Sequence, residues 1–347
     1  MEDLVLRHHV ELLPVTIDID RLRGPRLEID ADRFGRFTVE NLRSRPNQNS
    51  RSWFGTIGTT GRMAFVTSSH GVTGSIHTGT TVLQLVATHG RQVLLHWTDL
   101  PPAHPPDNTN CTDAGEPVSS GDPASTVTVS VVVGYTQAVA DCRDDVKEMV
   151  QSAIDEANLA NATCGTNFTF DLKETYAEDP NYTENKNFRA NLDAFASKDD
   201  GMLERVHDIR RKDGADLAVL VMDCDGRTRG LSKQIMASPD TAFSAVDYRF
   251  ADGYLTLAHE LGHLMGLRHD DDPCMNPYPK GHGFRTSTWR DVMSVMCTSS
   301  TCDGDWRSVW SNTQIAECGG NDTNSDCVSV LNQTSGVVAN FHSLLRQ

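Results

Sequence analysis

The chain has 347 residues, 38% of them hydrophobic, which suffices for one large domain or for two domains of ordinary size. Its formal net charge of −16 argues against nucleic acid or an anionic membrane surface as the main partner, because both are polyanions that would repel it. No apolar run approaches the roughly 20 residues that span a bilayer, so we expect no membrane span and, most simply, a monomer.

The first part of the chain is predicted to form a small antiparallel sheet. Short β-prone runs punctuated by Gly cover residues 63–67, 74–78, 81–88 and 92–97. A stretch rich in Pro, Asp, Gly and Ser follows and is typical of an exposed linker. We therefore divide the chain into a β-rich domain at 1–105, a linker at 106–125 and a second domain at 126–347.

The second domain is predicted to be an α/β unit. Residues 126–133 alternate Thr or Ser with Val, which has the period of a strand, and residues 144–158 place apolar side chains on one helical stripe. Residues 215–222 are nearly all apolar, as in a strand buried on both faces. The same patterns predict strands at 168–175 and 242–248, and helices at 200–211, from about 253, and at 334–345.

The most informative segment is HELGHLMGLRHD, residues 259–270. His259 and His263 stand four residues apart, so on a helix both imidazoles project from one face and can bind the same Zn²⁺. Gly266 can adopt a positive φ, which lets the chain leave the helix and bring His269 back as a third ligand. Glu260 then lies beside the metal. Three protein ligands leave one position for water, which indicates a catalytic zinc site.

This segment, together with Met293, resembles the signature of the metzincin zinc peptidases, an extended zinc motif followed by a Met-turn. Asp270 after the third histidine is similar to the reprolysin and adamalysin branch. The segments VVVGYTQAV, GADLAVLVMD, AFSAVDY, WRDVM and VWSN resemble the peptidyl-Asp metalloendopeptidases of that branch. The resemblance covers roughly residues 126–345, and the region before it is similar to that family's propeptide. It implies an α/β (α+β) metzincin catalytic domain, with a twisted mixed sheet and a long active-site helix, behind a small β-rich propeptide-like domain.

Two departures from the family pattern are relevant. Reprolysin-like enzymes often carry Cys-Gly where this chain has Arg229-Gly230, so a family disulfide is missing and Cys224 is expected to pair differently. Some metzincins place a tyrosine zinc ligand two residues after the Met of the turn, where this chain has Val295. Met296 in the place of Met293 would not supply a tyrosine either.

The resemblance implies a zinc-dependent metalloendopeptidase that hydrolyses peptide bonds in proteins or peptides, with Glu260 as the general base for a zinc-activated water. Met293 is expected to pack beneath the metal as an apolar floor. A second interpretation is a catalytically silent, zinc-stabilised adhesion or binding protein of the same fold, against which the intact Glu260 argues. It also remains open whether residues 1–105 are a propeptide or an independent binding module.

Latency and substrate choice have weaker signals. Cys111 lies in the linker as the natural leftover of nine cysteines and is one candidate for occupying the fourth zinc position before activation; Asp122 is another. The resemblance implies cleavage beside acidic residues, which demands a basic pocket in this acidic protein. Arg285 and Arg290 are the candidates for that pocket, and solvated surface is a slightly favoured alternative.

The run Asp322, Asn324 and Asp326 resembles the start of a Ca²⁺ loop. Cys327 replaces the expected Gly and no Glu closes the loop, so an ordinary polar loop is favoured over a calcium site.

Nine cysteines are too many for a typical cytosolic enzyme and none has metal-ligand spacing, so we expect disulfides and an oxidising compartment. The N-terminus does not resemble a signal peptide, yet we expect a secreted protein. Six Asn-x-Ser/Thr sequons fit a secreted glycoprotein, at Asn110, Asn161, Asn167, Asn181, Asn321 and Asn332.

Overall fold

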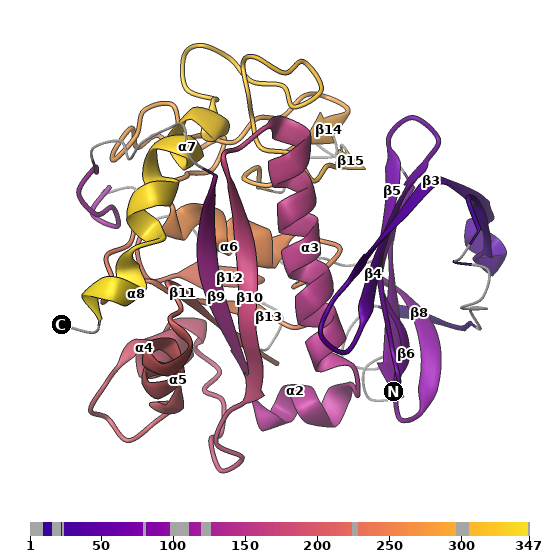
Figure 1. Cartoon of the computed structure of the whole chain (residues 1–347), viewed down its shortest axis with the longest axis horizontal. Coiled ribbons are helices and arrows are strands. Elements are labelled where there is room, and N and C mark those ends of the chain that lie inside the picture. The colour runs from indigo at the N-terminus through magenta and orange to yellow at the C-terminus, as the bar shows by residue number, and fades with distance from the viewer. Residues whose placement is uncertain are drawn as a thin grey trace.

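The computed structural model describes residues 10–15, 22, 24–78, 81–97, 111–118, 126–223, 228–295 and 305–345. Over these ranges the chain forms two units that lie side by side, an N-terminal sheet and a larger α/β unit (Figure 1).

The N-terminal unit is one eight-stranded antiparallel sheet in the order β1-β8-β7-β6-β5-β4-β3-β2. The four predicted strands are confirmed, and they are the last four of this sheet in chain order, β5 to β8. The first four were not predicted, and the exposed faces of the longest of them, β3, explain why: most of its residues contact solvent, so no apolar alternation marks it. The strands are β1 (Val10–Pro14), β2 (Leu27–Asp30), β3 (Arg36–Pro46), β4 (Arg51–Ile57), β5 (Gly61–Ser68), β6 (Gly71–His77), β7 (Val82–Thr88) and β8 (Arg91–Trp97), with a short 3-10 helix at Asp32–Phe34.

The α/β unit is built on a five-stranded mixed sheet in the order β10-β9-β11-β13-β12, in which the edge strand β12 pairs antiparallel and the other pairs are parallel. The strands are β9 (Val127–Tyr135), β10 (Phe168–Ala177), β11 (Leu217–Met222), β12 (Gly230–Ser232) and β13 (Phe243–Asp247), followed by the two-residue strands β14 (Trp289–Arg290) and β15 (Asp305–Trp306). The helices are α2 (Gln137–Cys142), α3 (Val146–Cys164), α4 (Phe188–Ala196), α5 (Arg205–Asp213), α6 (Thr256–Leu264), α7 (Cys327–Val338) and α8 (Phe341–Leu344).

Helices cover both faces of this sheet. Along β11, Val219 belongs to the apolar cluster that contains α3 and α6, while the next residue, Leu220, belongs to the cluster that contains α4 and α5. Neighbouring residues of a strand point to opposite faces, so a strand buried on both faces is apolar throughout. The prediction of a central buried strand and an α/β unit is confirmed.

Helix α6, which carries His259 and His263, is short, so the expectation of a long active-site helix is wrong. It has nine residues. Leu255 before it and Gly266 after it have φ of +61° and +101°, and left-handed residues interrupt a right-handed helix. The longest helix is α3, with 19 residues.

The N-terminal sheet packs on α3 through β5 and β6, as Figure 1 shows. Carboxylates of α3 are part of this contact: Ser75 Oγ donates to Glu156 Oε1 at 2.5 Å, and His70 Nδ1 lies 3.1 Å from Glu148 Oε1. An aromatic contact adds to it, with the rings of Trp97 and Phe250 5.6 Å apart. Both units therefore share buried surface along one side of α3.

Two disulfides cross-link the described residues, Cys111–Cys274 and Cys164–Cys318. The first shows that the expectation of an unpaired Cys111 is wrong. Residues 111–113 of the linker lie against the α/β unit, where Arg268 pairs with Asp113 at 2.9 Å and Asn276 Nδ2 donates to Cys111 O at 3.2 Å, and this brings the two sulfurs together. Cys111 therefore has no thiolate to offer a metal. Asp122, Cys224 and Met296 lie outside the described residues.

Candidate active site

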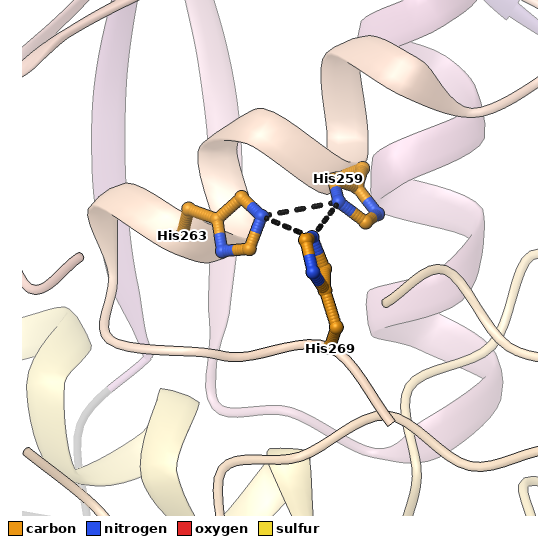
Figure 2. Close-up of side chains that lie close together, drawn as sticks. All are labelled: His259, His263 and His269. Atoms are coloured by element: carbon orange, nitrogen blue, oxygen red, sulfur yellow. Dashed lines mark hydrogen bonds between the residues drawn. The ribbon is translucent and has the colours of Figure 1, made fainter. Parts of the chain in front are cut away.

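The three histidines of the motif converge on one point (Figure 2). Nε2 of His259 and Nε2 of His263 lie 3.1 Å apart, and Nε2 of His269 lies 3.1 Å from the first and 3.0 Å from the second. All three side chains are buried. Within the described ranges, they are the one group of His, Cys, Asp or Glu residues close enough together to share a metal ion.

Backbone carbonyls fix the orientation of two of these rings. Nδ1 of His259 donates to Val292 O at 2.7 Å, and Nδ1 of His263 donates to Leu267 O at 2.8 Å. Each Nδ1 then carries the hydrogen, and each Nε2 presents a lone pair. Lone pairs this close repel unless a cation lies between them. Tetrahedral Zn²⁺, with Zn–N bonds of about 2.0–2.1 Å, separates its nitrogens by about 3.3 Å, so the histidines fit a zinc ion.

His269 reaches the site because the chain turns at Gly266. The positive φ predicted for this glycine is confirmed at +101°, and a Cβ there would lie 2.8 Å from the ring of Tyr278. His282, which is fully buried, supports the returning segment: its Nδ1 donates to His269 O at 2.9 Å. His269 is thus positioned by the turn of its own loop and by His282, which holds its backbone carbonyl.

Glu260 is fully buried beside the histidines and is held from the edge strand β12. Ser232 Oγ donates to Glu260 Oε2 at 2.7 Å and to Glu260 O at 3.0 Å. A Cβ on Gly230 would collide with Glu260 Oε1, so glycine is what lets β12 approach the carboxylate. Burial raises the pKa of Glu260 to about 7, against the opposing effects of His263 and of the Ser232 hydrogen bond. Ser232 was not predicted, because a single serine in a short strand carries no signal.

Met293 lies directly beneath α6. It is fully buried, and a Cβ on Gly262 would lie 2.6 Å from Met293 Sδ. The preceding residue, Val292, supplies the carbonyl that holds His259. The turn therefore both closes the underside of the helix and orients one histidine.

Asp270 ties the loop after the histidines to this turn. Its Oδ1 accepts the backbone N–H of Val295 at 3.1 Å, and its Oδ2 lies 2.8 Å from Arg285 Nε. The charge of Arg285 is thus matched by a carboxylate. Arg290 is buried, and its guanidinium lies 5.1 Å from the centre of the Trp306 ring.

The calcium-like run forms a polar turn that starts a helix. Asp326 caps α7 by accepting the N–H of Ser329, and Asn321 Oδ1 accepts the N–H groups of Thr323 and Asn324. Because Asp326 caps the helix, α7 begins at Cys327, seven residues before the start we predicted.

The sequence comparisons with known proteins point to one family. Residues 125–316 match the family model for metallo-peptidase family M12. A peptidyl-Asp metalloendopeptidase of Stenotrophomonas maltophilia is 33% identical over 297 residues, which cover 80% of this chain and 69% of that relative. A peptidyl-Asp metalloendopeptidase of Xanthomonas campestris is 31% identical over 352 residues, 95% of this chain and 82% of that relative. Metalloproteinase-II from Bacteroides fragilis aligns with a TM-score of 0.47 and 12% identity, over 82% of this chain and 88% of that one.

Within the part of the chain that the structure describes, no helix combines the length and apolar composition needed to cross a membrane.

Proposed function

The chain belongs to metallo-peptidase family M12 and is a zinc metalloendopeptidase, and on that premise we propose that His259, His263 and His269 hold its zinc while Glu260 is the general base. The observation that carries this assignment is the convergence of three Nε2 atoms within 3.1 Å beside a buried carboxylate. When bound, zinc supplies Lewis-acid chemistry that polarises a carbonyl and acidifies water.

The chain's own residues account for the proton transfers. A carboxyl whose pKa is raised toward neutral pH can accept a proton and return it, and burial shifts the pKa of Glu260 in that direction. Ser232 holds Oε2 by its hydrogen bond, and the other oxygen, Oε1, lies next to Gly230 of the same strand. Met293 excludes water from beneath the histidines. A silent binding protein would have no use for a base held in this way.

Substitution of the base tests the assignment. Glu260→Gln keeps the size of the side chain and should lower kcat/KM for a peptide by about 10² to 10⁴-fold while the protein keeps its zinc, measured by elemental analysis. Glu317→Gln, at an exposed position, is the matched control. Wild-type rates in Glu260→Gln would remove Glu260 from the mechanism.

The relatives' name suggests the substrate. We extend to this chain a preference for cleavage beside acidic residues, because two relatives that span most of it are peptidyl-Asp metalloendopeptidases. A digest of a random peptide library, sequenced by mass spectrometry, tests it: Asp or Glu should be enriched at one side of the cut.

The N-terminal sheet is proposed to keep the enzyme latent. It covers α3, and Arg62 Nη1 of β5 donates to Trp306 O at 2.6 Å, so it also reaches β15, the strand that pairs with Arg290 of β14. A protease site placed within residues 106–110 allows the test. Specific activity should rise after cutting, and equal activity before and after would contradict latency.

Secretion fits the two disulfides, which persist in oxidising compartments. We expect fewer than six of the sequons to carry a glycan, because Asn161 is buried and its Oδ1 accepts the indole N–H of Trp310 at 2.8 Å. Intact mass before and after glycosidase treatment of secreted protein tests both points.

A further inference from the structure

Arg229 is a buried cation whose guanidinium forms no hydrogen bond or ion pair with the residues that the structure describes. It exposes 1% of its surface and immediately precedes β12. Among the described residues, none accepts a hydrogen bond from Nε, Nη1 or Nη2 of its guanidinium. Buried guanidinium groups are ordinarily paired and hydrogen-bonded, because leaving their charge unmatched in a low dielectric is costly. An unmatched one indicates that the partner is supplied by another molecule.

A second arginine makes the surroundings more positive. The guanidinium of Arg229 lies 5.1 Å from the centre of the Trp306 ring, and that of Arg290 lies 5.1 Å from the centre of the same ring. Burial and the charge of Arg290 lower the pKa of Arg229 to about 10, although Tyr254 and Glu260 oppose the shift. In a chain with a net charge of −16, two guanidinium groups beside one indole ring suit an anionic ligand.

The position of Arg229 relates it to the peptide-cleaving site. Its neighbour Gly230 contacts Glu260, and Ser232 of the same strand donates to that carboxylate. Arg290 stands three residues before Met293, on the segment that lies beneath the histidines. Both arginines therefore come from the two segments that contact the active-site helix, one from each.

We propose that Arg229 is the specificity-determining residue of this enzyme and that its guanidinium binds the side-chain carboxylate of an aspartate beside the scissile bond, with Trp306 as the wall of the pocket. This inference rests on the proposed function and names the residue that carries out its substrate preference. It differs from the expectation based on sequence, in which Arg285 was a candidate, because Arg285 is matched by Asp270.

The N-terminal sheet contributes to the burial of this pocket. Arg62 contacts the backbone of Trp306, whose ring contacts Arg229. Release of the sheet would loosen Trp306 and open access to the guanidinium. Latency and specificity would then share one residue.

The test compares two quenched fluorescent peptides that differ only in Asp or Asn beside the scissile bond. Both are amidated at the C-terminus, so the Asp side chain is the distinguishing carboxylate. The enzyme is the full chain, loaded with zinc and cut within residues 106–110. Wild type should prefer the Asp peptide. Arg229→Met should lower kcat/KM for it by about 10²-fold or more, while the Asn peptide changes less than about threefold.

Three further variants sharpen the result. Arg229→Lys keeps the charge and should restore part of the preference, and Arg211→Met, at an exposed position on α5, should change neither rate. Arg290→Met tests the neighbouring cation. If Arg290→Met lost the preference for the Asp peptide while Arg229→Met kept it in full, the proposal would be overturned.

Stability separates a functional arginine from a structural one. The Arg229→Met substitution breaks no hydrogen bond or ion pair among the described residues and replaces the contact with the Trp306 ring by an apolar one. Arg229→Met should therefore leave the Tm of the uncut chain unchanged or raise it, whereas a marked fall in Tm would overturn the idea that the charge awaits a ligand. Retained preference in Arg229→Met would overturn the inference alone. Failure of wild type to cut any peptide would overturn the proposed function, and this inference with it.

Discussion

Removal of the Ser232 hydroxyl should shift the pH dependence of catalysis. Ser232 Oγ donates to Glu260 Oε2 at 2.7 Å, and this hydrogen bond favours the ionised carboxylate that accepts the proton. A hydrogen bond to a charged group contributes about 1.5–3 kcal/mol. Since one pKa unit corresponds to about 1.4 kcal/mol, Ser232→Ala should raise the pKa of Glu260 by about 1–2 units. Bound zinc lowers the absolute pKa in both proteins, so the difference between them is the quantity to compare.

The assay is kcat/KM for one peptide between pH 5 and 9. Below its pKa, the ionised fraction of Glu260 falls tenfold for each unit, so Ser232→Ala should lose about 10 to 100-fold at acidic pH and recover at alkaline pH. Ser232→Thr retains a hydroxyl and should resemble wild type. An equal loss at every pH, with zinc content unchanged, would refute the role of Ser232 in setting the protonation of Glu260.

Three predictions concern stability. Burial raises the pKa of Asp252 to about 7. The contribution of its protonated carboxyl to the free energy of unfolding is therefore full below about pH 4 and is lost, by up to about 4 kcal/mol, as the pH rises through 7. Asp252→Asn should raise Tm more at pH 8 than at pH 5, and a pH-independent change would contradict this. Gly262→Ala should cost about 1–3 kcal/mol because its methyl group would press on Met293, measured by urea unfolding of the zinc-loaded protein, and an unchanged midpoint would be inconsistent with the packing. Replacing Cys164 and Cys318 by Ala should cost about 2–5 kcal/mol, because that disulfide closes a loop of 154 residues; no loss in the same assay would argue against the bond.

The parts of the site that the sequence predicted are local. Two histidines four residues apart and a glycine that reverses the chain specify their geometry within eleven residues, so His259, His263 and His269 could be placed together without knowledge of the fold. The central strand β11 was equally accessible, because a run of apolar residues needs no partner to be recognised.

The parts that the sequence did not predict depend on contacts between distant segments. Ser232 meets Glu260 because β12 lies beside α6, and neither residue marks the other in the sequence. Cys111 pairs with Cys274, 163 residues away, and spacing alone does not select one pairing among many. Arg229 was noticed as a departure from the family pattern, but its lack of a partner is visible only once its surroundings are assembled.

The Cys111–Cys274 disulfide determines which cut in the linker can separate the two units. A cut between Cys111 and β9 breaks the polypeptide but leaves the N-terminal sheet covalently attached to the α/β unit through the sulfurs. The sheet would then stay at a high effective concentration near α3 and continue to dock. A cut before Cys111 frees it, and dilution favours its loss. The two products differ in one simple property: the first runs as a single species without reductant and as two with it. Under the latency that we propose, the position of one cysteine makes activation sensitive both to where a protease cuts and to the redox potential of the surroundings.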